Sequence, residues 1–125
     1  MAHQYYIYLG RERGKRVIHK VGKTTQGCWN RCKNSDYLIG LGIEILLPGE
    51  TRTARNKQLS EIETKMIQCF TEKFTVEHGC EYFRTTNHKW NTVKEIFLAE
   101  IEEILNLKGW EYIIHDGWVG VDNIY

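Results

Sequence analysis

The side chains best suited to chemistry gather near the start of the chain, in the stretch from Tyr5 to Arg31. Residues 5–10 and 16–23 form two short runs typical of β-strands, and a polar turn containing Gly14 separates them. Such runs joined by a short, glycine-containing linker are typical of a β-hairpin. The stretch is therefore expected to fold as two antiparallel strands, followed by a segment of helical character that contains Arg31.

The tyrosines of this hairpin are expected to share a face with a lysine. Side chains alternate between the two faces of a strand, so Tyr6 and Tyr8 point the same way. If the turn centres near Arg13, Lys20 of the second strand lies opposite Tyr6 on that face. The hairpin is thus expected to present two phenols and an ammonium together.

A guanidinium and a carboxylate further along the chain could complete a site. Arg31 falls within a helix predicted over 27–36 and is expected near the boundary between core and solvent, facing the hairpin.

The candidate carboxylate is Glu63, in a helix predicted over 53–73. It occupies a position where the apolar stripe expects a hydrophobic residue, and a charge there is costly without a cation or hydrogen bonds. Pattern alone leaves two interpretations open, a functional carboxylate and a residue at the edge of the stripe that meets Arg31. The other members of the stripe are Leu59, Ile67, Phe70 and Phe74.

The order of these residues along the chain carries a further signal. Tyr6-Ile7-Tyr8 and Lys20-Val21-Gly22, the latter followed by Lys23-Thr24-Thr25, precede Arg31, and Glu63 opens an E-x-x-h-h-x-x-F pattern. This set resembles the two signatures, the arginine and the acidic residue of the GIY-YIG nuclease family. Tyr6 stands where the family name has Gly and Lys20 where it has the second Tyr. The second signature looks most like a branch that reads K-[IV]-G-[KR]-T.

The resemblance implies a metal-dependent endonuclease that hydrolyses DNA. In that scheme Tyr8 takes a proton from the attacking water or orients it, and Lys20 and Lys23 favour the phenolate by their charge. Arg31 contacts the scissile phosphate, and Glu63 holds one Mg²⁺ or Mn²⁺.

Two features of the scheme are open at this point. Tyr6 either positions the phosphate or stacks on a neighbour. Lys20 replaces the second signature tyrosine of the family, and the sequence does not indicate which residue takes over the role of that tyrosine. The plain alternative is that the tyrosines are strand aromatics and that Arg31 and Glu63 form a structural salt bridge.

The rest of the sequence predicts one α+β domain. Residues 43–47 form a third apolar β run after a turn bracketed by Gly40 and Gly42, so a small three-stranded antiparallel sheet flanked by helices is expected. Residues 1–86 carry the motifs. Residues 87–125 are expected to hold a helix over 87–107, ended by Gly109, and a tail that could form a hairpin around Asp116-Gly117.

Charge is distributed unevenly along the chain. The net charge is +1, but residues 1–57 carry eleven Lys and Arg against four Asp and Glu. A basic half suggests an anionic partner such as DNA, with paired surface charge as the plainer alternative. The basic residues expected to contact DNA are Arg11, Arg13, Lys15, Arg16, Lys33, Arg52 and Arg55.

Cysteine usage and hydropathy limit the classes of protein to which the chain could belong. An intracellular protein, cytoplasmic or nuclear, without a membrane partner is expected, because the chain has no apolar run of membrane-spanning length and its start lacks a secretory signal. Cys28, Cys32, His78 and Cys80 could hold zinc in principle, but their spacing fits no common zinc module. Reduced, largely buried thiols are favoured.

Two other functions stay open. One is a non-catalytic nucleic-acid-binding module that kept the fold. The other is a protein-interaction domain that uses the acidic face of the helix over 87–107. The apolar tail leaves room for a homodimer contact, and the domain could also serve a larger DNA-processing assembly.

Overall fold

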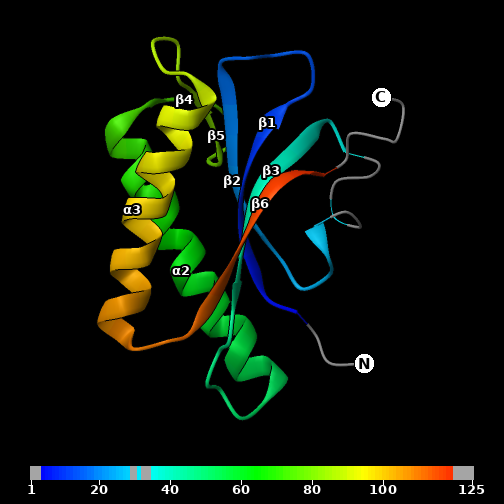
Figure 1. Ribbon diagram of the computed structural model, residues 1–125, viewed down its shortest axis with the longest axis vertical. Coiled ribbons are helices and arrows are strands. Elements are labelled where there is room, and N and C mark those ends of the chain that lie inside the picture. Colours follow the sequence, from blue (N-terminus) through cyan, green and yellow to red (C-terminus); the bar gives the residue numbers. More distant parts are fainter. Residues whose placement is uncertain (1–3, 29–30, 32–34, 120–125) are drawn as a thin grey trace.

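The computed structural model describes residues 4–28, 31 and 35–119, and within them one antiparallel sheet of six strands is covered on one face by two helices (Figure 1). The strand order is β4-β5-β2-β1-β3-β6, so β1 lies at the centre of the sheet beside β2 and β3. The elements in chain order are β1 (Tyr6–Glu12), β2 (Ile18–Thr24), β3 (Tyr37–Ile45), α2 (Arg52–Lys73), β4 (Thr75–His78), β5 (Tyr82–Arg84), α3 (Trp90–Lys108) and β6 (Tyr112–Val119).

The sheet is twice as wide as the sequence predicted, so the prediction of a three-stranded sheet was wrong. β4 and β5 were missed because they are only four and three residues long, too short to show a period of two. β6 runs straight through Asp116-Gly117, where a turn was expected, and pairs with β3. The C-terminal tail is therefore part of the sheet and forms no separate hairpin within the described residues.

The first hairpin forms as expected, but with a different register. The structure pairs Tyr6 with Thr24 and Gly10 with Lys20, so the turn centres near Lys15 and the predicted pairing of Lys20 with Tyr6 was wrong. The shift moves each strand position by an even number of residues. Because side chains alternate with a period of two, Lys20 stays on the face that carries the tyrosines.

β3 begins earlier than predicted and includes both glycines that were expected to bracket a turn. A methyl group at Gly40 would collide with the Trp90 indole, and one at Gly42 would press on the Cys28 sulfur. The glycines therefore mark places where neighbouring side chains lie against the strand, which is a common reason for glycine within a sheet.

The two helices pack their apolar stripes on one face of the sheet. Both were predicted close to their observed bounds, and Gly109 ends α3 with a left-handed φ of 71° as expected. Thr51 caps α2 by accepting a hydrogen bond from the Ala54 amide at 3.0 Å. The fully buried helix residues are Leu59, Ile62, Met66 and Phe70 of α2 and Val93, Phe97, Ile101 and Leu105 of α3.

A second, smaller cluster lies on the opposite face of the sheet. The described part of the connection between β2 and β3 runs on that side, away from the helices (Figure 1). Half of the helix predicted over 27–36 lies outside the described residues, and Cys28 and Arg31 have helical backbone. The buried members of the cluster are Tyr8, Ile18, Tyr37, Ile39 and Tyr82. Of the helices that the structure describes, none is long and apolar enough to cross a membrane.

Candidate active site

The Tyr8 hydroxyl is the centre of the candidate site. It accepts a hydrogen bond from the Lys20 ammonium at 2.8 Å and shares another with the Tyr37 hydroxyl at 3.0 Å. The Arg31 guanidinium lies within hydrogen-bonding reach of the same oxygen. Side chains from β2 and from the segment after β2 therefore meet at the phenol of β1.

Glu63 reaches this group from the helix side of the sheet. Its carboxylate lies 3.9 Å from the Lys23 ammonium, which also donates a hydrogen bond to the Ser60 hydroxyl. It interacts electrostatically with Lys20 and Arg31 as well. Glu63 thus turns toward the residues of the site, although it lies beside the buried stripe of α2 and not within it.

The edge of β2 brings the two faces of the sheet together. Within the described part of the chain, β5 pairs with β2 only as far as Lys20, so the outer edge from Gly22 to Thr24 has no neighbouring strand. Lys23 points to the helix side, while Lys20 points to the tyrosine side. Side chains from both faces can therefore meet around this edge.

A polar cleft of about 460 Å³ lies beside that edge. It contains two cationic side chains, from Lys23 and Arg31, and is floored in part by the first turns of α2. Two cations in a cleft of this size are suited to a phosphate group. The residues that line the cleft are Lys23, Thr24, Thr25, Gln26, Arg31, Asn56 and Leu59.

The protonation of Tyr8 differs from the sequence-based expectation. The side chain is fully buried, and burial raises its pKa well above the ordinary value of a tyrosine. The hydrogen bond with Tyr37 raises this pKa further, and Arg31 opposes both effects only in part. Burial and Tyr37 therefore favour the neutral phenol of Tyr8, whereas the scheme implied by the resemblance uses neighbouring lysines to favour the phenolate.

Lys20 is the group of the pair that loses a proton more easily. Only 5% of its surface is exposed, and burial lowers its pKa below the ordinary value of a lysine, although the Glu81 carboxylate acts in the opposite direction. Its ammonium lies 4.5 Å from the centroid of the Tyr37 ring and 5.7 Å from that of Tyr82. These aromatic faces partly replace the water that the ammonium loses.

The carboxylate of Glu63 is also perturbed by its surroundings. Burial raises its pKa above the ordinary value, while the positive charges of Lys23 and Lys20 act to lower it. Its side chain is 22% exposed. An added cation at Glu63 would therefore replace lost hydration and would be favoured by the carboxylate.

The resemblance implies a single protein ligand, Glu63, for a metal ion. Among residues 4–28, 31 and 35–119, no group of three or more His, Cys, Asp or Glu side chains could hold a metal ion. Mg²⁺ is commonly bound by one or two carboxylates together with substrate phosphates and water. Glu63, beside a cleft suited to a phosphate, fits such a substrate-assisted site for Mg²⁺ or Mn²⁺.

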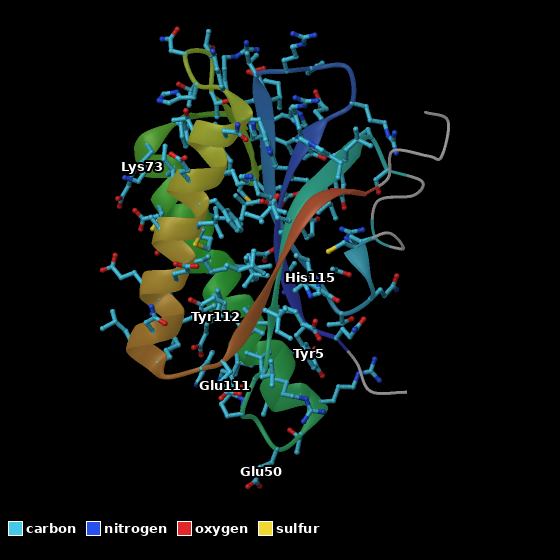
Figure 2. The ribbon with its side chains drawn as sticks, in the orientation of Figure 1. Tyr5, Glu50, Lys73, Glu111, Tyr112 and His115 are labelled. Atoms are coloured by element: carbon cyan, nitrogen blue, oxygen red, sulfur yellow. The ribbon has the colours of Figure 1, made fainter. Side chains whose placement is uncertain are left out.

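Tyr6 lies apart from the other predicted catalytic residues. Its ring packs 5.7 Å from that of His115 on β6, which is labelled in Figure 2, and burial raises its pKa. His115 in turn pairs with Glu44 at 2.9 Å. Tyr6 and Tyr8 thus share a face of β1 but have different partners, and the ring contact of Tyr6 agrees with the stacking role that the sequence left open for it.

The basic residues predicted to bind DNA do not form one surface. The turn between β1 and β2 lies at one end of the molecule and the start of α2, next to Glu50, at the other (Figures 1 and 2). Several have structural partners: Arg11 stacks on Trp118 at 4.9 Å, and Arg55 donates hydrogen bonds to Tyr5 and to the Gly49 carbonyl.

The other basic residues of that prediction differ in their surroundings. Arg13 donates to the Ser35 carbonyl at 2.8 Å, and Lys15 pairs with Glu12 at 2.9 Å. Arg16 and Arg52 are exposed, and Lys33 lies outside the described residues. Arg31 and Lys23 are the cations that line the cleft itself.

Two residues near Tyr8 and Lys20 were not assigned a role from the sequence. Tyr37 was not singled out, since an aromatic residue at the start of a strand carries no functional signal. Glu81 interacts electrostatically with Lys20, Arg31 and Glu63. Tyr82 packs against this group, and its hydroxyl donates to Asp36 at 3.3 Å.

The described cysteines differ in exposure. Cys28 and Cys69 are half-buried and Cys80 is exposed, so the expectation of largely buried thiols holds only in part. Burial and the nearby Glu100 raise the pKa of Cys69 to about 11. This thiol is therefore protonated at neutral pH and poorly suited to nucleophilic chemistry.

Comparison with known proteins assigns no relative to the chain, since no family model, curated protein or solved structure matches it. The interpretation of the site depends on its geometry and on the motifs quoted above. Membership of the GIY-YIG family stays a prediction.

Proposed function

We propose that the protein is a metal-dependent endonuclease that hydrolyses DNA phosphodiester bonds at the edge of β2. The observation that carries the proposal is the position of Arg31. It lines the polar cleft, reaches the Tyr8 hydroxyl and interacts electrostatically with Glu63. One guanidinium thus links the polar cleft to the proton-transfer pair and to the carboxylate.

Each of these groups has a distinct task in the proposal. Arg31 and Lys23 bind the scissile phosphate, where Arg31 offers two parallel donors to its oxygens. Glu63 holds Mg²⁺ or Mn²⁺, and the ion supplies electrostatic stabilisation of the leaving 3′ oxygen. Tyr8 and Lys20 act as a pair that orients the attacking water.

The lysine is the proton acceptor of that pair. Burial lowers the pKa of Lys20 and raises that of Tyr8, so the ammonium gives up its proton before the phenol does. Once Lys20 is a neutral amine, the Tyr8 hydrogen can turn from Tyr37 to the amine nitrogen 2.8 Å away, while the Tyr8 oxygen takes a proton from the attacking water. Substrate must first draw Arg31 away from Tyr8, because Tyr8 is fully buried.

The burial of Tyr8 also favours a second candidate, a nucleic-acid-binding module without catalysis. A phenol with no exposed surface and three partners meets the requirements of a structural residue. In that case the cleft binds a backbone phosphate through Arg31 and Lys23 and no hydrolysis follows.

A plasmid-nicking assay with Mg²⁺ or Mn²⁺ separates the two candidates. We expect cleavage by the wild type and a loss on the order of 100-fold or more in Glu63→Ala and Tyr8→Phe, because each removes a group used in the transition state. Glu61→Ala is the matched control, since Glu61 lies on the same helix but is exposed. It should cleave like the wild type.

The binding of short duplex DNA at low salt completes the test. Retained binding in all three variants, with metal-dependent cleavage only in the wild type and Glu61→Ala, supports the nuclease. Binding without cleavage in any protein supports the module. The absence of both would contradict each candidate, because phosphate contacts are strongest at low ionic strength.

A further inference from the structure

Tyr37 of β3 contacts most of the candidate site. Its hydroxyl lies 3.0 Å from that of Tyr8, and the two rings are stacked with centroids 5.8 Å apart and planes 9° apart. The Lys20 ammonium lies over its ring at 4.5 Å. With 3% of its surface exposed, Tyr37 has little freedom to adopt another position.

The donors and acceptors around Tyr8 determine what Tyr37 does. A phenol has one hydrogen to donate and oxygen lone pairs to accept with. Lys20 as an ammonium and Arg31 as a guanidinium are donors only, and both are directed at the Tyr8 oxygen. The hydrogen of Tyr8 is then left for the one acceptor among its partners, which is the Tyr37 hydroxyl at 3.0 Å.

We infer that Tyr37 is a positioning residue of the site, which receives the Tyr8 hydroxyl hydrogen and thereby directs the accepting side of the Tyr8 oxygen to Lys20 and Arg31. The inference rests on the proposed function for its catalytic meaning, but the hydrogen bond itself does not. When a phosphate draws Arg31 away, the lone pair that becomes free is the one on the cleft side. A water there would find Tyr8 as an acceptor.

The charges and titrating groups around Tyr8 agree with this role. Lys20 faces it from β2, Arg31 from the segment after β2 and Tyr37 from β3. The bond with Tyr37 raises the pKa of Tyr8, in addition to the effect of burial. Removal of the Tyr37 hydroxyl should therefore loosen the Tyr8 hydrogen and make the phenol easier to ionise.

The test is exchange of the Tyr8 hydroxyl hydrogen, followed by NMR on protein with ¹³Cζ-labelled tyrosine. Tyr37→Phe keeps the stacked ring and the surface over Lys20 but removes the acceptor. We expect the exchange of the Tyr8 hydroxyl to become about tenfold faster, as for the loss of a buried hydrogen bond. Tyr82→Phe is the matched control, because it removes a hydroxyl from the same cluster that bonds Asp36 instead of Tyr8.

Several results of the exchange experiment would decide whether Tyr37 positions the Tyr8 hydroxyl. Equal Tyr8 exchange in Tyr37→Phe and in the wild type would overturn the inference, as would equal acceleration in Tyr82→Phe. In the wild type alone, the Tyr8 hydroxyl should exchange at least about tenfold more slowly than that of the partly exposed Tyr112. Comparable rates would count against the inference even if Tyr37→Phe failed to fold.

The pH dependence of DNA cleavage provides a separate test, because it would not change if Tyr37 had a purely structural role. The pH dependence of plasmid cleavage should shift to lower pH in Tyr37→Phe and stay in place in Tyr82→Phe. If no protein cleaves DNA, the proposed function fails, while hydroxyl exchange still decides whether Tyr37 holds Tyr8. If cleavage occurs and the profile of Tyr37→Phe is unchanged, the positioning role fails on its own.

Discussion

His19 gives the fold a built-in sensitivity to acid. The side chain lies on β2, is fully buried and stacks on the Trp90 indole with centroids 5.5 Å apart. Its Nδ1 lies 2.7 Å from the Thr85 hydroxyl, which donates its own hydrogen to the Val17 carbonyl. Nδ1 therefore carries the imidazole hydrogen, and Nε2 is a buried acceptor that has no hydrogen-bond partner among the described residues.

A charged imidazole is strongly disfavoured in this position. Burial lowers the pKa of His19 from the ordinary 6.5 to about 4, with Arg11 and His88 acting in the same direction. The unfolded chain therefore takes up a proton before the folded one as the pH falls. The stability that neutral His19 contributes is present above about pH 6.5 and is lost as the pH drops toward about 4.

The loss of unfolding free energy at low pH follows from the shift in the pKa of His19. One pKa unit corresponds to about 1.4 kcal/mol, so the largest loss of stability, reached well below the folded pKa, is about 3 kcal/mol. Between about pH 7 and about pH 4.5 the loss of stability is roughly 2 kcal/mol. His19→Phe keeps a flat ring against Trp90 and removes the titrating group. We expect this variant to lose roughly 2 kcal/mol less than the wild type over the same interval.

Urea unfolding at the two pH values measures the difference directly. Losses due to carboxylates, such as Glu12, occur in both proteins and cancel in the comparison. His88→Gln is the control, because it removes an exposed histidine from the same region. Equal pH dependence in the wild type and His19→Phe would refute the reasoning, and so would an equal change in His88→Gln.

Three further substitutions test the packing that supports the site. Gly22→Ala would place a methyl group against the Tyr8 hydroxyl, so urea unfolding should show a loss of about 1–3 kcal/mol, whereas Gly27→Ala, in open space, should be nearly neutral. Thr51→Ala removes the cap of α2 and should lower the free energy of unfolding by about 1 kcal/mol; an unchanged value would contradict the capping role. Phe70→Ala should destabilise by about 3–5 kcal/mol in the same measurement, since Phe70 is fully buried against Phe83 and Phe97, and a loss below about 1 kcal/mol would be incompatible with that packing.

Local patterns predicted the parts of the fold that local interactions dominate. The hairpin was predicted from two β runs and a glycine-containing turn, and both described helices from apolar residues at helical spacing. Gly109 was predicted to end α3 and does so with a left-handed backbone. In each case the signal lies within one or two turns of chain, where sequence neighbours are also neighbours in space.

The tertiary structure decided which residues meet. The register of the hairpin depends on where the turn closes, so Lys20 lies beside Tyr8 by pairing with Gly10 instead of Tyr6. Gly40 and Gly42 could be recognised as strand residues only once the Trp90 and Cys28 side chains that lie over them were placed.

From the sequence alone came the residue types of the site and their order: phenols, a lysine, a guanidinium and a carboxylate. Only the folded chain determined that Tyr8 is buried, that the Tyr6 ring packs against His115 and that Tyr37 is hydrogen-bonded to Tyr8. The physical reason is that protonation and hydrogen bonding depend on burial and on partners from other strands, whose distances are set by sheet pairing and not by separation along the chain.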